Sequence, residues 1–429
     1  MLLEFKIKNF MSIKDELILN MEANSKNDLE DNISVIDKER VLKSACILGA
    51  NAHGKSTIVK AFTSAIIFIR NSNLLQDGVK LPWMVPFKFD DVTIKEPSFF
   101  EFTFMTNETK YIYGFSADVN KVHDEYLYKY SSSKPSLMFK RTNTNDYEFP
   151  QITKARLNEI VKNNTENKLL FSTANVWNFN EFKEPFEWFM KNINTYSDFN
   201  LGMIDIAKYN NDEIKKSVLK ILNNSDISIK DYNIEIVNRK LNNNEKGPII
   251  LINAMMGNTL PANDSVREIR ITTKHEVIDT KGNKREYTLD MSEESLGTQK
   301  MFYIGLVLQD ILNGQTMIID ELENSLHPFL VEYLIKMFHN PKVNTNNAQL
   351  IFTSHSKPLL NLDLFRREQI YFAEKELNSS KTEIYSLSDY SVRKNEDIEK
   401  GYTNGRYGAV PFIGEDLWED FSKEKESQK

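Results

Sequence analysis

The stretch GANAHGKST, from Gly49 to Thr57, has the spacing of a phosphate-binding loop: a glycine, four other residues, a second glycine, then lysine and serine. The apolar segment VLKSACILG at 41–49 leads into it and predicts a buried strand. The segment GKSTIVKAFTSAIIFIR at 54–70 follows and places its apolar residues on one helical face. Strand, glycine loop and helix is the order that this loop requires.

The loop residues predict contacts with a nucleotide and Mg²⁺. Small glycines let backbone N–H groups converge on phosphate oxygens, and the following helix directs the positive end of its dipole there. Lys55 would reach the β- and γ-phosphates, Ser56 would hold Mg²⁺, and Thr57 would bond the α-phosphate side. The predicted ATP-binding residues of the loop are Gly49, Asn51, Gly54, Lys55, Ser56 and Thr57. The alternative is a glycine-bearing turn without a ligand, and His53 is interpreted as a solvent-facing loop residue.

A second motif, TMIIDELENSLHP at 316–328, brings two adjacent acids to the end of an apolar strand. Asp320 is predicted to hold Mg²⁺, directly or through water, and Glu321 to orient and polarise the attacking water. A solvated strand end is the alternative for this motif alone. The phosphate loop favours the catalytic interpretation.

Two further motifs lie on either side of this strand. IFTSHS at 351–356 ends a predicted strand in His355, which is either a hydrogen-bonded structural residue or a catalytic one near the γ-phosphate. MSEESLGTQK at 291–300 places Ser295 and Gly297 before an apolar helix, where they form either a helix cap or a second phosphate cradle. One site does not easily use two cradles, so we expect two molecules to sandwich the nucleotide.

Length and composition are those of a protein with two or three structural units. The chain has 429 residues, 41% of them hydrophobic and 27% charged, with a formal net charge of −7. It has no apolar run of membrane-spanning length and no apolar signal core at its N-terminus, so we expect a cytoplasmic protein without a membrane partner. The single cysteine, Cys46, excludes an internal disulfide and is predicted to be buried in a strand.

The distribution of patterns predicts an α/β fold with a parallel sheet covered on both sides. Alternation over the first twenty residues predicts a hairpin, and residues 86–130 predict an antiparallel meander rich in Phe and Tyr. The pattern at 150–245 is helical, and the final third returns to alternating strands and helices. We expect an N-terminal ATPase lobe at 1–150, a mainly helical insertion at 151–250, and a C-terminal ATPase lobe at 251–429.

Taken in order, these motifs resemble ABC-type ATPase heads of the SMC, RecF and OLD kind, which also begin with a hairpin such as IKNFMSI. The resemblance implies a mixed sheet with a phosphate loop and an antiparallel meander. It also implies that Ser295 and Gly297 act in trans as the signature motif, that Glu323 to His327 form the D-loop at a dimer seam, and that His355 is the switch histidine. The signature reads SLGT instead of LSGGQ, and no Q-loop glutamine is assigned, although Gln76 is available.

More narrowly, the chain is similar to bacterial AAA-type ATPases of phage-defence and abortive-infection loci, the RloA-like and PARIS ATPase-subunit group. The matching stretches are SEESLGTQK, DELENSLHP, RREQIYF at 366–372 and GRYGAVP at 405–411. This resemblance implies a homodimer or higher homo-oligomer that controls a separately encoded nuclease or toxin. GRYGAVP itself is either a tight turn or a segment whose Arg406 contacts a phosphate or partner.

Three functions remain open on the sequence. The first is an ATP-gated switch, in which ATP joins two heads and hydrolysis separates them. The second is a DNA-clamping or DNA-repair ATPase, which needs a basic groove; the Lys-rich middle is mixed with acids and Asn. The third, a transporter ATPase, is disfavoured by the N-terminal hairpin and the missing LSGGQ.

Overall fold

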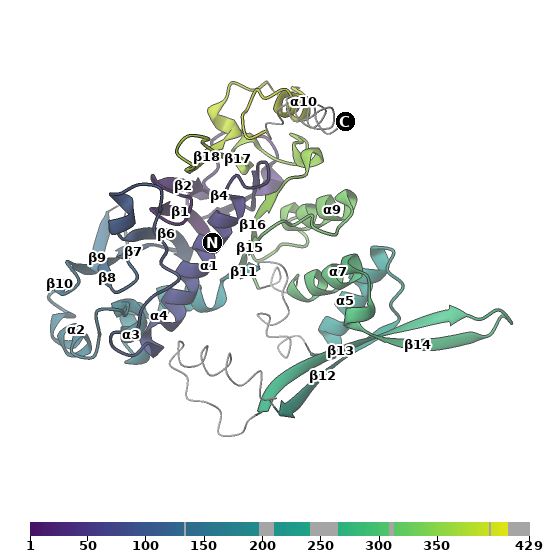
Figure 1. The fold of residues 1–429 in the computed structure, drawn as a ribbon, viewed down its shortest axis with the longest axis horizontal. Helices are drawn as coiled ribbons and strands as arrows, with labels where there is room; N and C mark the ends of the chain where they lie inside the picture. The colour runs from purple at the N-terminus through teal and green to yellow at the C-terminus, as the bar shows by residue number, and fades with distance from the viewer. Residues whose placement is uncertain (133, 197–209, 241–264, 309–312, 394–395, 411–429) are drawn as a thin grey trace, which may run out of the picture.

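The structure, a computed structural model, describes residues 1–429 except 133, 197–209, 241–264, 309–312, 394–395 and 411–429 (Figure 1). Its two large sheets lie side by side, with helices between and around them, and a long three-stranded arm extends from the side that carries α5 and α7. The chemistry-bearing motifs lie on the second of the two sheets.

The first sheet is antiparallel and contains seven strands in the order β10-β9-β8-β7-β6-β1-β2. Alternate residues of its strands, such as Phe100, Phe102 and Phe104, are buried, as expected for a sheet with one covered face. The predicted N-terminal hairpin and meander are therefore confirmed. The strands are β1 (Leu2–Lys8), β2 (Leu17–Asn20), β6 (Ser98–Thr106), β7 (Thr109–Ala117), β8 (Val122–Tyr130), β9 (Pro135–Thr142) and β10 (Asp146–Glu148).

The second sheet contains six strands in the order β11-β15-β16-β5-β17-β18. The first five run parallel, and only β17 and β18 pair antiparallel. Every residue of β5, β15 and β16 is buried, which explains why these strands are mostly apolar without the alternation of a half-exposed strand. The strands are β5 (Ser44–Leu48), β11 (Ile193–Tyr196), β15 (Thr316–Ile319), β16 (Gln349–Ser354), β17 (Ile370–Lys375) and β18 (Thr382–Ser386).

Helices cover both faces of this parallel sheet, so the predicted α/β fold is confirmed. Helix α1 (Lys55–Asn71) belongs to one hydrophobic core together with Ile47, Ile318 and the first sheet. Helices α7 (Leu296–Val307) and α9 (Pro328–His339) belong to a second core on the opposite face, with Cys46 among its residues. Successive strand residues point to opposite faces, so neighbouring residues such as Cys46 and Ile47 enter different cores.

Residues 151–250, where the sequence predicts mainly helix, also contain strands. Helices α2 (Lys154–Val161), α3 (Leu170–Val176) and α4 (Asn180–Lys191) lie beside the first sheet, and β11 follows and pairs with β15 in the parallel sheet. Helix α5 (Asp212–Asn224) precedes β12 (Asp231–Lys240). Residues 197–209 and 241–250 of this stretch lie outside the described residues.

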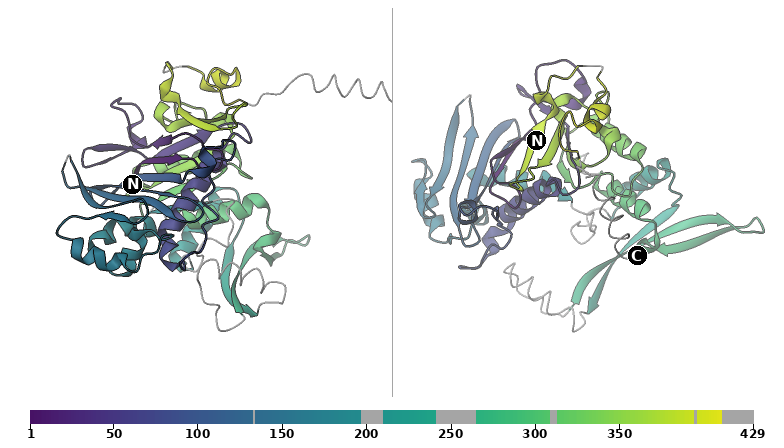
Figure 2. Two further views of the ribbon diagram at one scale, coloured as in Figure 1. Left: turned by 60° about the vertical axis from the view of Figure 1, so that its left-hand side comes forward. Right: turned by 45° about the horizontal axis from the view of Figure 1, so that its top comes forward.

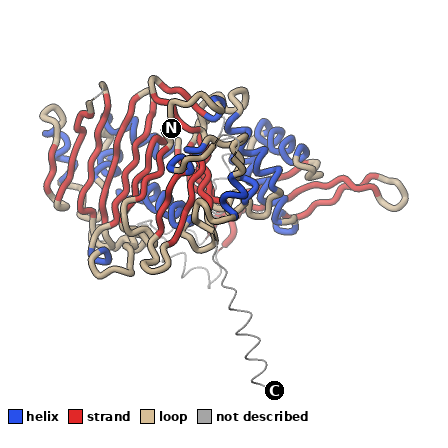
Figure 3. The backbone as a smooth tube through the Cα atoms, turned by 90° about the horizontal axis from the view of Figure 1, so that it is seen from above, coloured by secondary structure: helices blue, strands red, loops and turns tan. Residues whose placement is uncertain are grey.

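Strand β12 belongs to the arm, which we define as β12, β13 (Ser265–Ile278) and β14 (Lys284–Asp290). Residues 265–274 of β13 pair with β12 and residues 272–278 pair with β14, so the two pairings overlap over only three residues. The arm extends away from the rest of the molecule (Figure 3). Buried Ile234 and Ile271 join the base of the arm to the core that contains α7. Strand β14 then leads directly into α7.

The C-terminal part of the chain returns to the N-terminal strands. Figure 2 shows β17, β18 and α10 (Ile398–Thr403), in yellow-green to yellow, beside the N-terminal strands in purple. The backbone N–H of Thr382 in β18 donates to the carbonyl of Ser12, next to the first hairpin. A small hairpin of β3 (Ile33–Ile36) and β4 (Glu39–Leu42) completes this region. No helix in the described ranges is long and apolar enough to cross a membrane.

Candidate functional site

Three of the predicted motifs meet at one edge of the parallel sheet. The phosphate loop follows β5, the acids follow β15, and His355 follows β16, which lies between the other two strands. Parallel strands present their carboxyl ends at the same edge. Strand order therefore brings together residues that are about 270 positions apart in the sequence.

Both glycines of the phosphate loop are required because atoms of β17 and β18 pack closely against them. A Cβ on Gly49 would lie 2.4 Å from the carbonyl oxygen of Ala373, and one on Gly54 would lie 2.1 Å from Oγ1 of Thr382. Gly54 also has φ of +91° at the N-cap of α1, a conformation that favours glycine. Ala373 of β17 and Thr382 of β18 thus pack directly against the loop.

Lys55 is buried at the start of α1, where its Nζ donates to the carbonyls of Gly49 at 2.8 Å and Ala50 at 3.0 Å. Burial lowers the pKa of Lys55, and the nearby acids Glu321, Glu323 and Asp320 oppose this shift. A buried cation inside a glycine cradle, with acids close by, fits a bound phosphate and a divalent cation.

The outer side of the loop is tied to the N-terminal hairpin. Ser12 donates to Oγ1 of Thr57 at 3.0 Å, and Thr382 donates to Oγ of Ser12 at 2.9 Å. Ser56 lies between Lys55 and Thr57 on the first turn of α1, and Asn51 is exposed at the tip of the loop.

His53, interpreted from the sequence as solvent-facing, is half-buried, and its Nδ1 points away from solvent. That atom is buried and has no hydrogen-bond partner among the described residues. The carbonyl of His53 accepts from Thr382 at 3.4 Å. The loop folds against β18, and this packing was not visible in the loop's own sequence.

One hydroxyl positions both acids of the DE pair. Thr353, in β16, donates to Oδ1 of Asp320 at 2.5 Å and accepts from the backbone N–H of Glu321 at 2.8 Å. The N–H of Asp320 donates to the carbonyl of Tyr196 at 3.0 Å, and Lys300 donates to the carbonyl of Glu321 at 2.9 Å. Sequence reasoning missed Thr353, although it lies in the IFTSHS motif.

His355 is paired with an acid from the neighbouring strand's loop. Its Nδ1 lies 2.9 Å from Oε1 of Glu323, and its backbone N–H donates to the same oxygen at 2.5 Å. The Glu323 side chain is nine-tenths buried, whereas that of His355 is half-exposed. The imidazole is thus held by Glu323 with a free face toward solvent. Glu323 was expected at a dimer seam, and in the single chain it orients His355.

Ser295 and Gly297 lie at the start of α7, against the loop that follows β15. Ser295 caps α7 by accepting from the N–H of Thr298 at 3.1 Å, as in the helix-cap interpretation. A Cβ on Gly297 would lie 3.0 Å from the carbonyl oxygen of Ser325. Among the described residues, no hydrogen bond or ion pair links Ser295 or Gly297 to the stretch 49–57. The cap therefore stands beside the loop that follows β15.

A cleft of about 250 Å³ opens between the start of α7 and the loop after β15. Its lining includes Asp320, so the same acid borders both the cleft and the edge of the parallel sheet. The lining residues are Leu296, Gln299, Lys300, Tyr303, Asp320, Asn324 and Ser325.

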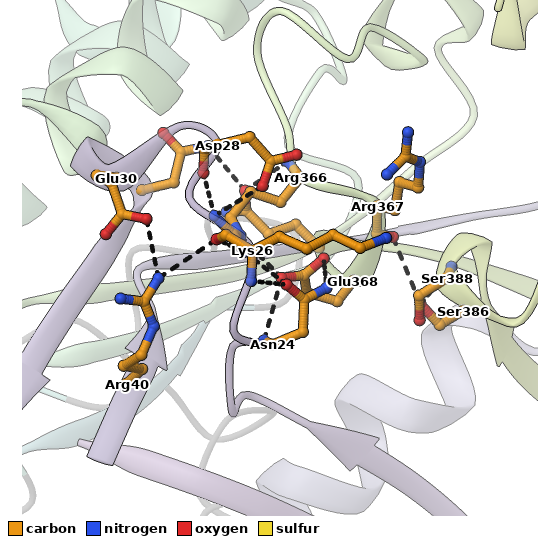
Figure 4. Close-up of polar contacts among 12 residues, drawn as sticks. Asn24, Lys26, Asp28, Glu30, Arg40, Arg366, Arg367, Glu368, Ser386 and Ser388 are labelled. Atoms are coloured by element: carbon orange, nitrogen blue, oxygen red, sulfur yellow. Dashed lines mark hydrogen bonds and ion pairs between the residues drawn. The ribbon is translucent and has the colours of Figure 1, made fainter. Parts of the chain in front are cut away.

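The RREQIYF stretch has a structural role. Arg366 is fully buried and its guanidinium reaches into the turn at 24–28, as Figure 4 shows. It donates to Glu368 at 2.8 Å, to Asn24 at 2.9 Å, and to the carbonyls of Lys26 and Asp28. All of its donor nitrogens have partners, which is the condition for burying a guanidinium.

Gln76 lies away from the phosphate loop. It follows the far end of the 17-residue helix α1, about 25 Å of helix from Lys55. Its carbonyl accepts from Asn167 at 2.8 Å. The structure thus offers no support for Gln76 as the residue that senses the γ-phosphate.

Comparison with known proteins gives a family and distant structural neighbours. Among solved structures, the SMC head domain from Thermotoga maritima is similar, at 11% identity and a TM-score of 0.38, covering 90% of this chain and 98% of that one. An SMC head with an extended coiled coil, bound to the C-terminal domain of ScpA and derived from Pyrococcus furiosus, has 10% identity and a TM-score of 0.39, covering 94% and 98%. Among curated proteins there is no match.

A family model described as "AAA domain, putative AbiEii toxin, Type IV TA system" matches residues 44–363. The match begins at β5, before the phosphate loop, and ends after His355, so it contains all the predicted site residues. It covers well over half of the chain. The protein therefore belongs to this AAA-domain family.

Proposed function

We propose that the protein binds Mg–ATP at the phosphate loop and hydrolyses it to ADP and phosphate. One observation carries the proposal: a single hydroxyl, that of Thr353, holds Asp320 and Glu321 at the sheet edge where the buried Lys55 of the glycine loop also lies. Membership of an AAA-domain family supports the same activity.

The chain's own residues divide the chemistry between them. Backbone N–H groups of the loop and Lys55 would bind the phosphates, while Ser56 and Asp320 would hold Mg²⁺ through oxygen ligands. When bound, Mg²⁺ neutralises charge on the β- and γ-phosphates. Glu321 would accept the proton of the attacking water as general base, and His355, oriented by Glu323, would contact the γ-phosphate.

The site is proposed to be completed by a second copy of the chain. Ser295 and Gly297 lie at the N-terminus of α7, where backbone N–H groups can bind phosphate, and within the described ranges neither residue hydrogen-bonds to the phosphate loop of its own chain. ATP would then join two heads, and hydrolysis would release them.

We propose that this association acts as a switch in bacterial anti-phage defence and controls a separately encoded effector. Support comes from the family description, which names a putative toxin of a toxin–antitoxin system, and from the motif resemblance to phage-defence ATPases. ATP acts here through the difference between two assembly states. DNA clamping is the second candidate, but lysines at the arm are paired with acids: Lys230 with Glu276 and Glu286, and Lys284 with Glu276.

Nucleotide binding and phosphate release by the purified chain test the enzymatic part. Lys55→Ala should weaken Mg–ATP binding by about 10- to 100-fold, since charge-assisted hydrogen bonds are lost. Lys60→Ala, an exposed lysine on the same helix, is the matched control and should bind like the wild type. Equal affinity of the Lys55→Ala and wild-type proteins for Mg–ATP would show that the phosphate loop is not the nucleotide-binding site.

A further inference from the structure

The stretch that contains residues 405–410, the described part of GRYGAVP, contacts the phosphate loop. We call residues 398–410, which comprise α10 and the turns after it, the strap. The carbonyl oxygen of Ala409 accepts a hydrogen bond from the N–H of Ala50 at 3.1 Å. Ala50 is the second residue of the loop, so the strap reaches the loop's first turn from about 360 positions away in the sequence.

Aromatic stacking fixes the strap to the strand that supports the loop. The rings of Tyr402 and Tyr407 both stack on Phe372, with centroids 5.6 and 5.7 Å away and planes within 11°. Phe372 lies in β17 opposite Leu48, the residue before Gly49. Tyr407 is fully buried. The strap and the beginning of the phosphate loop thus both pack on β17.

Hydroxyl groups set the direction of the strap's carbonyls. Tyr385 donates to the carbonyl of Tyr407 at 2.7 Å, and Tyr402 donates to the carbonyl of Ala409 at 2.8 Å. Ala409 has φ of +56°, which is uncommon for a residue with a Cβ. A rare backbone conformation, held by surrounding hydrogen bonds, turns this carbonyl toward Ala50.

The hydrogen bond between Ala50 and Ala409 is important because, under the proposed function, Lys55 exchanges its carbonyl partners for a phosphate. The Lys55 ammonium donates hydrogen bonds to the carbonyls of Gly49 and Ala50, and phosphate binding would draw it away from them. The bond from Ala50 to Ala409 does not involve Lys55. It therefore keeps the first turn of the loop in place while the lysine moves.

We infer that Tyr402, Tyr407 and Ala409 are positioning residues of the nucleotide site, which hold the phosphate loop in the geometry that binds ATP. This inference rests on the proposed ATP-binding function. Arg406, for which a phosphate contact was considered, pairs instead with Glu396. The described residues of the GRYGAVP stretch, 405–410, are thereby assigned to the support of the phosphate loop.

Amide hydrogen exchange of the full chain without nucleotide tests directly whether the strap restrains the phosphate loop. In Tyr407→Ala, peptides covering 49–57 should exchange about five- to tenfold faster than in the wild type, because the bond to Ala50 is loosened. Tyr407→Phe keeps the stacking and should restore slow exchange. Thr403→Ala is the control, since this exposed residue of α10 bonds only within its helix. Exchange in β7 should not change in any variant.

A second variant covers the case in which Tyr407→Ala does not fold. Tyr385→Phe combined with Tyr402→Phe keeps every ring and removes both hydroxyl donors, so the same loop peptides should exchange faster. Wild-type exchange at 49–57 in this folded protein would overturn the inference.

Nucleotide affinity then separates this inference from the proposed function. If the strap positions the loop, each variant that speeds loop exchange should also weaken Mg–ATP binding, by about three- to tenfold. Unchanged affinity in a protein with faster loop exchange would overturn the positioning role. Failure of the wild type itself to bind Mg–ATP would overturn the proposed function, while the exchange result would still report whether the strap holds the loop.

Discussion

Thr353 shows how much of the candidate site depends on one side chain. Its hydroxyl both donates to Asp320 and accepts from the N–H of Glu321, so removing it frees one acid and leaves a backbone donor without its partner. We expect Thr353→Val to lower ATP turnover by about 10- to 100-fold, the usual effect of losing a residue that orients metal ligands. Steady-state phosphate release measures this.

Two matched variants make the Thr353 test specific. Thr353→Ser retains the hydroxyl and should retain most of the turnover. Ser354→Ala changes the next residue, whose hydroxyl accepts from the N–H of Ser356, and should have little effect. If Thr353→Val turned over ATP like the wild type, the hydroxyl would not position the acids.

Glu321 is the proposed general base, and its neutral isostere should separate binding from hydrolysis. Glu321→Gln should bind Mg–ATP with near wild-type affinity and hydrolyse it at least about 100-fold more slowly, because the base is lost while the loop is intact. Rapid-quench single-turnover measurements give the chemical rate. Undiminished hydrolysis would exclude Glu321 as the base.

At the residue scale, the sequence predicts the groups with a recognisable spacing and misses those that support them. Lys55, Asp320 and Glu321 lie in motifs whose neighbours reveal their strands and loops. Ser12 and Thr382 bond each other across 370 positions, and no local pattern marks such a pair. Thr353 was missed for the same reason: its partners belong to a different strand.

At the scale of elements, the end of α9 makes the fold sensitive to acid. His339, its last residue, is buried with Nε2 2.7 Å from Oγ of Ser44 in β5, and burial, aided by Lys43, lowers the pKa of His339 to about 3. The folded-state pKa lies below the unfolded value of about 6.5, so stability from neutral His339 is present above pH 6.5 and is lost as pH falls toward 3.

The expected result is a loss of up to about 1.4 kcal/mol in unfolding free energy per pH unit within that window, attributable to His339. Urea denaturation of the wild type and His339→Gln between pH 7 and pH 4 measures the difference in slope, since glutamine does not titrate. Parallel slopes for the two proteins would show that His339 does not titrate on unfolding in this range.

Elements with strong periodicity were predictable, and those that depend on distant partners were not. The α1 helix and the strands β5, β15 and β16 follow from apolar runs bounded by polar loops. Strand β12 also alternates, with Ile234 buried, but its partner β13 begins about 25 residues later. The arm therefore could not be inferred from the helical pattern around it.

At the scale of the whole molecule, the proposed nucleotide site is divided between two chains. The phosphate loop, the acids and His355 share one sheet edge, whereas the cap of α7 borders the loop after β15 and, in the part of the chain that the structure describes, has no hydrogen bond to the phosphate loop. The arm leads into this cap, because β14 ends at Asp290 and α7 begins at Leu296. Glu294 joins the two by contacts with Thr273 and His275 of β13.

Variants for a mixing experiment can be chosen so that the fold is retained. Ser295→Asp should still cap α7, since aspartate is a good N-cap residue, and its charge would repel a phosphate bound in trans. Ser295→Asn is the neutral control of the same shape and should be less harmful. The second protein in the mixture carries Lys55→Ala, which removes the lysine of the phosphate loop.

The ATP turnover of a mixture of Lys55→Ala and Ser295→Asp proteins, each expected to be inactive alone, tests directly whether two chains share each site. If two chains share each site, mixed dimers contain one intact site, and an equal mixture should recover about a quarter of wild-type turnover. Absence of recovery, with both variants folded and with mixed dimers demonstrated, would show that two chains do not share each site.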